Sequence, residues 1–161
     1  KPTEISRLSQ YPVWWKGACG HKWKDKVFCR AVEETRCIYC EKEFVQVLPR
    51  LLVMVYAKQC GTKVSINDEK TIGILLDVLL PEVNLAFTFP SRETDWGAKV
   101  IEVMQYMCAA RKIQLIEVRK KEPIELAHEI KQAFAKAHLY IDSDSEKEID
   151  YLRKWYFHQT V

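Results

Sequence analysis

The sequence predicts a small N-terminal module followed by a larger mixed α/β domain. Four of the six cysteines fall within residues 19–40. Downstream, short runs rich in Ile, Leu and Val alternate with longer segments whose apolar residues recur at helical spacing. A chain of 161 residues with 48% hydrophobic and 29% charged residues is globular in composition and long enough for one small and one medium domain.

The cysteine-rich module contains two closely spaced pairs of metal-binding residues, Cys19-x-His21 and, after fifteen further residues, Cys37-x-x-Cys40. Zn²⁺ takes four thiolate or imidazole ligands in a tetrahedron, and two such pairs can approach it from opposite sides. A chain that starts without the apolar segment of a secretion signal is expected in a reducing compartment, where clustered thiols bind metal more often than they pair. The spacing therefore predicts a zinc site, with Cys29 outside it as a packed small side chain.

The residues between the two pairs predict the local structure of the module. The alternating run over residues 23–30 is typical of a hairpin strand. A module this short buries too little apolar surface to fold alone. Zinc binding is therefore expected to contribute on the order of 10 kcal/mol of folding free energy.

The module resembles a zinc-ribbon family of bacterial proteins of the treble-clef type, whose pattern reads W-x-C-x-x-G-H-x-W, then R, then C-P-x-C. The resemblance covers residues 11–44. It implies that the zinc ligands are Cys19, His21, Cys37 and Cys40. Trp23 and Arg30 match framework positions of the family pattern. Gly20 directly follows Cys19 here, and Ile38 replaces the proline, but all four ligands are retained.

The charge of the chain is unevenly distributed. Residues 1–60 hold 11 basic and 6 acidic residues, whereas residues 61–161 hold 14 and 16. Nucleic acid is the commonest partner of such a basic end, and modules of this family are often found beside nuclease-like domains, which favours DNA. The residues predicted to contact DNA are Lys16, Lys22, Lys24, Lys26, Arg30 and Arg36. Trp14 and Trp15 interleave with them and can stack on bases, whereas Trp23 is expected in the core; a merely solvated basic face is the alternative.

After the module, the pattern predicts the element order α-β-β-β-α-β-α-α. Helices are expected over residues 45–60, 94–111 and 123–138 and after residue 143, and strands over residues 62–66, 71–80, 83–89 and 113–118. Gly61 and Pro123 stand where a helix ends and begins. Ser143 and Glu146 have the spacing of a capping box.

Residues 76–87 resemble the D-x-x-x-P-E segment of PD-(D/E)xK nucleases of the very-short-patch-repair type, and the resemblance spans residues 62–120. It implies that residues 45–161 form a restriction-endonuclease-like domain, a mixed sheet flanked by helices. In such enzymes carboxylates at the ends of two adjacent strands hold one Mg²⁺ ion. The first of these falls on Asp77.

The second carboxylate of that pattern falls on Thr88, and its lysine falls on Pro90. A neutral hydroxyl and a proline cannot hold Mg²⁺ or activate its water, so the catalytic centre is expected to be degenerate, with Asp77 and Lys99 as vestiges. A purely structural Asp77 that bonds backbone amides at the strand end is an equally open interpretation.

Three functions remain open from the sequence. The first is a zinc-dependent DNA-binding protein with an inactive nuclease-like domain, working as a homodimer or in a nucleoprotein complex. The second is an active Mg²⁺-dependent endonuclease in which Glu93 or Asp95, with Lys99, completes the site of Asp77. The third is a protein-interaction adaptor whose contact surface is an aromatic tail, formed by Tyr151, Trp155, Tyr156 and Phe157.

The sequence also indicates where the protein works. No uncharged apolar run approaches the roughly 18 residues of a membrane span, so no membrane partner is expected. Without a signal-like start, a cytoplasmic location is expected. Residue 1 is lysine rather than methionine, which is consistent with further residues upstream.

Overall fold

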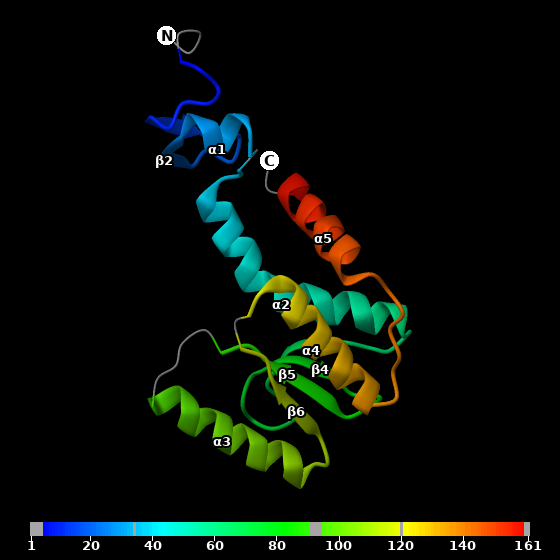
Figure 1. The fold of residues 1–161 in the computed structure, drawn as a ribbon. Helices are drawn as coiled ribbons and strands as arrows, with labels where there is room; N and C mark the ends of the chain where they lie inside the picture. Colours follow the sequence, from blue (N-terminus) through cyan, green and yellow to red (C-terminus); the bar gives the residue numbers. More distant parts are fainter. Residues whose placement is uncertain (1–4, 34, 91–94, 120, 160–161) are drawn as a thin grey trace. The chain divides into compact units, whose positions relative to one another are not determined.

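A computed structural model describes residues 5–33, 35–90, 95–119 and 121–159 (Figure 1). The chain is a mixed α/β protein, as predicted, and divides into two compact units. The finger unit comprises Lys1–Val45 and Arg153–Val161, and the sheet unit comprises Gln46–Leu152. In the described part of the chain, no helix combines the length and apolar character needed to cross a membrane.

The finger unit is built on a two-stranded antiparallel hairpin. Strand β1 (Pro12–Lys16) pairs with β2 (Lys22–Lys26), and Trp15 lies opposite Trp23. The strand predicted over residues 23–30 ends at Lys26, where the short helix α1 (Val27–Ala31) begins. One further hydrogen bond, from the N–H of Val27 to the carbonyl of Tyr11 at 3.3 Å, follows the Pro12–Lys26 pair before the chain turns into α1.

Helices α2 and α5 each contribute residues to both units. Helix α2 (Ile38–Gln59) begins seven residues before the predicted helix at 45, and α5 spans Ser145–Gln159. Pro49 lies inside α2 and has no N–H to donate toward the carbonyl of Val45. The division between the two units falls at this same point of the chain.

The sheet unit contains a four-stranded sheet in the order β3-β4-β5-β6. Its first three strands form an antiparallel meander, and β6 returns parallel to β5 after the crossover helix α3. The element order predicted after the module is confirmed. The bounds are Ser65–Asp68 for β3, Leu76–Leu80 for β4, Leu85–Thr88 for β5, Asp95–Ala110 for α3, Gln114–Glu117 for β6 and Pro123–Lys136 for α4.

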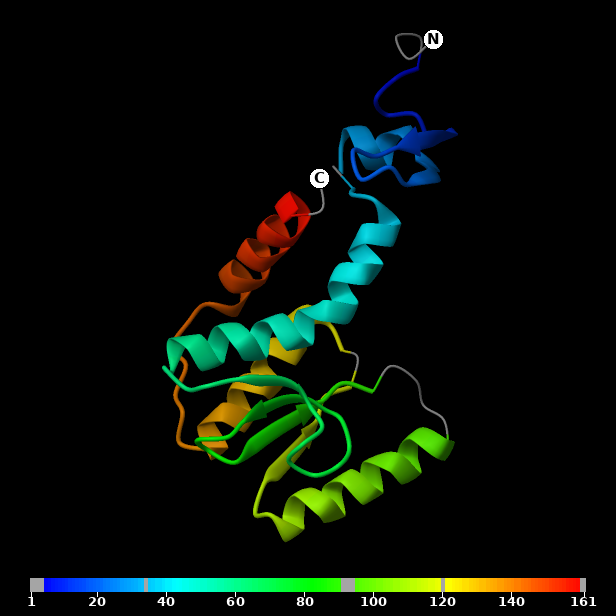
Figure 2. The ribbon, with the colours of Figure 1, turned by 180° about the vertical axis from the view of Figure 1, so that it is seen from behind.

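Helices cover both faces of this sheet (Figures 1 and 2). On one face, Met104 and Cys108 of α3 pack against a buried cluster that includes Leu79 and Ala86. On the other face, Phe134 of α4 stacks on Phe87 with a centroid distance of 5.8 Å and meets Tyr56 of α2 edge-on at 6.0 Å. Strands β4 and β5 are thus packed between helices on both faces of the sheet.

Two local predictions were wrong. The strand predicted over residues 71–80 starts only at Leu76, because a turn precedes it in which Gly73 has a φ of +77° and its N–H bonds to the carbonyl of Glu69. The predicted cap Ser143 does not start α5. Instead, one carboxylate oxygen of Asp144 accepts the N–H groups of Glu146 and Lys147, and this charged cap sets the helix start one residue later.

Candidate metal centre

The first ligand pair lies in the turn between β1 and β2. Gly17 donates its N–H to the carbonyl of His21 at 3.0 Å, and Gly20 donates to the carbonyl of Gly17 at the same distance. Gly20 has a φ of +79°, a conformation that side chains rarely tolerate. Gly20, which directly follows Cys19, thus allows Cys19 and His21 to lie on one side of the turn.

The second ligand pair lies at the start of α2. Cys37 directly precedes the helix, its carbonyl accepts the N–H of Glu41, and Cys40 follows in the first turn. Positions i and i+3 share one side of a helix, so both thiols face the hairpin turn. Cys37 and Cys40 therefore reach the site from a helix start, whereas Cys19 and His21 reach it from a turn.

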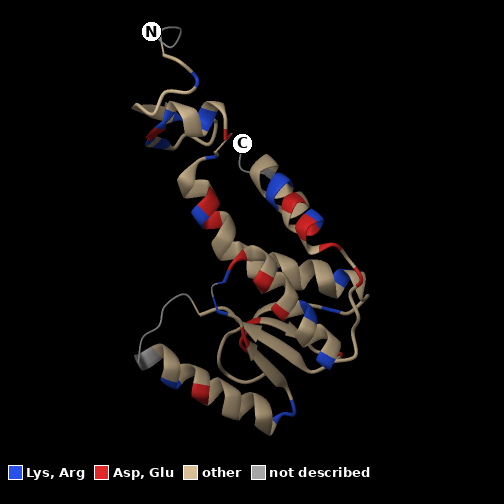
Figure 3. Cartoon of the chain, viewed as in Figure 1, with Lys and Arg blue, Asp and Glu red and all other residues tan. Residues whose placement is uncertain are grey.

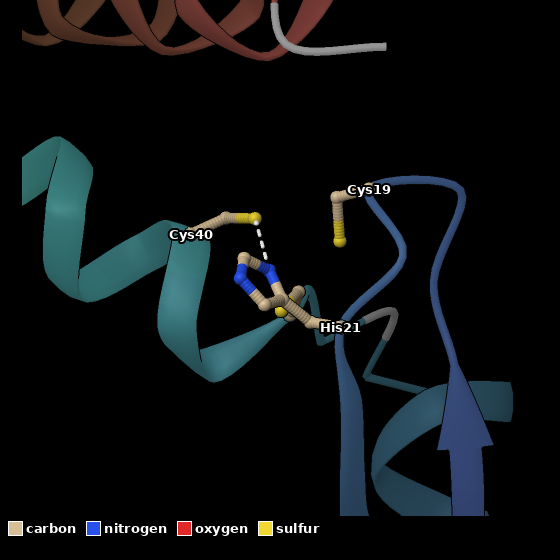
Figure 4. A group of neighbouring side chains, drawn as sticks. Cys19, His21 and Cys40 are labelled. Atoms are coloured by element: carbon tan, nitrogen blue, oxygen red, sulfur yellow. Dashed lines mark hydrogen bonds between the residues drawn. The ribbon is translucent and has the colours of Figure 1, made fainter.

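The four ligand atoms converge. The Sγ atoms of the three cysteines and a ring nitrogen of His21 all lie within 4.8 Å of one another. Cys40 Sγ is 3.4 Å from Nδ1 of His21, and Figure 4 shows Cys19 on the opposite side of this contact. A tetrahedral zinc site has ligand–ligand edges of about 3.5–3.8 Å. A small contraction of the cluster would therefore accommodate Zn²⁺.

The pKa values of the thiols show what a bound cation would change. The backbone N–H of His21 lowers the pKa of Cys19 to about 7, whereas burial, together with the neighbouring Cys19 and Cys37, raises the pKa of Cys40 to about 12. Three thiolates this close repel one another unless positive charge lies between them. Zn²⁺ would supply that charge and deprotonate all three.

Tight packing surrounds the cluster. A Cβ atom on Gly17 would lie 2.9 Å from Cys19 Sγ and 3.2 Å from the ring of Trp23, so no side chain fits there. Trp23 is buried, and the guanidinium of Arg30 lies over the rings of Trp15 and Trp23 and donates to the carbonyl of Thr35. Trp23 and Arg30 thus pack next to the metal cluster.

Phe157 is a residue of this site that the sequence did not identify. It packs against the cluster of Trp23, Cys37 and Cys40, and its ring lies 6.0 Å from that of Phe44. The guanidinium of Arg36 lies 5.1 Å from the Phe157 ring centre. Because Phe157 is far from the ligands in sequence, no local pattern could reveal this contact. One residue of the predicted aromatic tail, Phe157, thus packs within the finger unit instead of forming part of an exposed contact surface.

Replacing Phe157 with alanine is expected to loosen the zinc site. The side chain is only partly buried, so the finger unit should lose about 1–2 kcal/mol of stability, less than a fully buried phenylalanine would cost. The measurement is the rate of zinc release to a chromophoric chelator, which should rise several-fold. Trp155→Ala on the same helix is the matched control, and equal release rates in the two variants would contradict the role of Phe157.

The predicted vestigial residue Asp77 lies in the sheet unit, and both of its carboxylate oxygens are hydrogen-bonded to protein groups. Its Oδ1 accepts from Arg50 at 3.0 Å. Its Oδ2 accepts from the hydroxyl of Thr88 at 3.1 Å and from the N–H of Phe89 at 2.9 Å. Thr88, in the position of the expected second carboxylate, is therefore a hydrogen-bond donor to Asp77.

The other residues considered for a magnesium site lie in α3 or just before it in the sequence. Lys99 is exposed on α3, Asp95 is the first residue of α3, and Glu93 lies outside the described residues. Glu117, beside Thr88 in the parallel register, bonds to Arg119 at 2.8 Å. Among the described residues, three or more His, Cys, Asp or Glu ligands converge only in the finger.

The residues predicted to contact DNA divide into two groups. The four lysines, Lys16, Lys22, Lys24 and Lys26, are exposed on the hairpin, where Figure 3 shows basic segments. Arg30 lies in the packing beside the zinc site, and Arg36 is exposed but rests on Phe157. Of the tryptophans, Trp14 is 73% exposed, Trp15 is half-buried and Trp23 is buried.

Comparison with known proteins identifies the N-terminal part of the chain. Residues 1–43 match a family model described as "Probable Treble clef zinc finger domain". No curated protein and no solved structure matches the chain significantly. With side chains from a hairpin turn and a helix start converging on one point, the N-terminal part of the chain resembles a treble-clef zinc finger, and Cys19, His21, Cys37 and Cys40 form a cluster that fits one metal ion.

Proposed function

We propose that this protein is a zinc-dependent DNA-binding protein whose second domain is nuclease-like in topology and has no working catalytic centre. The observation that carries the proposal is a row of exposed lysines on one face of the finger hairpin. Zinc would fix the turn and the helix start that hold this face in shape. The protein would then bind DNA through the finger.

The strand register explains how this face forms. Side chains alternate along each strand, so Lys16 and Lys22 are direct partners on the same face, followed by Lys24 and Lys26 along β2. Like charges directly opposite each other destabilise a hairpin. Among the described residues, none of these four lysines forms a salt bridge with a carboxylate. DNA phosphates would supply the missing negative charge.

The sheet unit supports the second half of the proposal. A three-strand meander, a crossover helix and a parallel fourth strand are what the nuclease resemblance implies. The surroundings of Asp77 favour an inactive centre over an active endonuclease, because the Arg50 guanidinium already provides the cation next to that carboxylate. A magnesium ion would have to displace Arg50 and would find the neutral Thr88 as its neighbour.

A titration tests the DNA-binding half. Fluorescence anisotropy with labelled DNA should show an affinity that falls steeply as salt is raised. The double variant Lys22→Glu with Lys24→Glu is expected to bind about ten-fold or more weakly and to reduce the salt slope by about 2. The control, Lys42→Glu with Lys58→Glu on exposed positions of α2, has the same change in net charge and should keep the wild-type affinity.

The outcomes separate DNA binding from the adaptor function. If the wild-type protein shows no salt-sensitive affinity for DNA, the proposal fails. If both double variants weaken binding equally, the effect is one of total charge rather than of the hairpin face. An adaptor working through the exposed aromatics Tyr151 and Trp155 predicts that neither lysine variant changes partner binding.

A further inference from the structure

Trp14 occupies the centre of the lysine face with its indole in solvent. Its side chain is 73% exposed, the highest exposure of a tryptophan among the described side chains. Lys24 lies directly opposite Trp14, and Lys16 lies two residues along the same strand. The other tryptophans of the hairpin, Trp15 and Trp23, point to the opposite face and pack beside the zinc site. Trp14 therefore takes no part in the core of the finger.

The combination of one exposed indole and a row of lysines matches a particular form of nucleic acid. Base-on-aromatic stacking needs an unpaired base, because the faces of paired bases in a duplex are covered by their neighbours. Alternate residues of β2 lie about 7 Å apart, so its three lysines form an extended row. A single strand running along this row can place its phosphates on the lysines and one base on Trp14.

We propose that the outward face of the β1–β2 hairpin binds single-stranded DNA, with Trp14 as the stacking platform and Lys16, Lys22, Lys24 and Lys26 as the phosphate contacts. The inference rests on the proposed DNA binding and specifies its substrate class. Charge complementarity selects a polyanion. The exposed indole then selects an unpaired strand over a duplex.

The experiment compares oligonucleotides and variants by fluorescence anisotropy on the full chain loaded with zinc. The probes are a labelled oligothymidine, a duplex of the same length and a single-stranded oligouridine. The wild-type protein should bind oligothymidine more tightly than the duplex. Trp14→Ala should weaken oligothymidine binding about 5- to 100-fold and leave duplex binding and the salt slope unchanged. Trp14→Phe should restore part of the loss.

Two controls show whether a loss of oligothymidine binding comes from the Trp14 ring itself. Trp155→Ala removes a 43% exposed indole on α5 and should leave oligothymidine binding unchanged. The zinc content of the Trp14→Ala sample shows whether the finger is intact, and we expect it to be unchanged because Trp14 is exposed. Trp14→Phe repeats the binding comparison with an aromatic ring retained. If neither Trp14 variant affects oligothymidine binding, the stacking role is wrong.

The failures of the two proposals are distinguishable. Equal affinity for duplex and single strand, together with a loss in the double lysine variant, would overturn the single-strand assignment and leave DNA binding standing. Tighter binding to oligouridine than to oligothymidine would replace DNA by RNA as the ligand. No affinity for any of the three probes would end both proposals.

Discussion

Chelation of zinc is expected to unfold the finger unit while the sheet unit stays folded. The buried cluster at the site consists of Trp23, Cys37 and Cys40, two of which belong to the metal cluster, and the other buried apolar residues described in the finger unit are Val27 and Phe44. Without metal, so small a core cannot offset the conformational entropy of ordering the hairpin. Zinc binding contributes on the order of 10 kcal/mol to the folding of modules of this kind. The sheet unit has its own core between α3, α4 and the strands.

Amide NMR spectra before and after chelation measure this difference. Signals of the hairpin residues should collapse into the random-coil region, and signals of β4 and β5 should keep their dispersion. Cys40→Ser should give the same spectrum even with zinc present, because it removes one of four ligands from the buried side of the site. Acidification should act in the same direction, since protons compete with zinc for the thiolates and the imidazole.

Cysteine controls separate the metal effect from general thiol effects. Cys29→Ser and Cys60→Ser change thiols that lie outside the four-ligand cluster and should leave zinc stoichiometry at one per chain. A chelated protein that keeps dispersed hairpin signals would show that the fold does not depend on metal. In that case the zinc-dependent part of the proposed function would fail as well.

The zinc ligands and the element order could be predicted because their signals are local. Cys19-x-His21 and Cys37-x-x-Cys40 show the chemistry in their spacing, and hydrophobic periodicity places every helix and strand in the right order, with the largest errors at the starts of α2 and β4. The start of α2 was predicted too late because Ile38 and Tyr39 in its first turn are exposed and Cys40 belongs to the metal cluster, so this turn does not extend the apolar stripe of the helix.

Contacts between distant segments could not be predicted in this way. Phe157 reaches the zinc site, and Arg50 reaches Asp77, through the tertiary fold, and neither residue carries a motif that points to its partner. The basic residues show the same limit. Composition alone groups Arg30 with the lysines, but the register of the hairpin turns the lysines outward and leaves Arg30 stacked on two tryptophans.

Asp77→Ala is expected to destabilise the sheet unit without changing any nuclease activity. The carboxylate, with a side chain only 24% exposed, holds Arg50, Thr88 and the N–H of Phe89. Its removal leaves a partly buried guanidinium without its anion and a backbone N–H without its acceptor. Losses of this kind cost about 2–4 kcal/mol in total. The interaction joins α2 to the ends of β4 and β5, so those strands should be the first to open.

Hydrogen exchange of the β4 and β5 amides in urea measures this loss within the sheet unit, independently of the finger. Glu102→Ala, at an exposed position of α3, is the control and should leave exchange unchanged. Asp77→Asn should fall between wild type and Asp77→Ala, because the amide oxygen can still accept the N–H of Phe89 while the charge pair with Arg50 is lost. A double-mutant cycle with Arg50→Met isolates the energy of that pair.

Plasmid nicking with Mg²⁺ or Mn²⁺ completes the test of Asp77. If Asp77 serves as an internal anchor, wild-type protein and Asp77→Ala should both leave plasmid uncut at high excess, and only stability should differ. Cutting by the wild type that disappears in an Asp77→Ala protein of unchanged stability would reverse this interpretation. Arg50 would then have to move away during turnover to admit the metal. The protein would be an active endonuclease rather than a DNA-binding protein with an inactive nuclease-like domain.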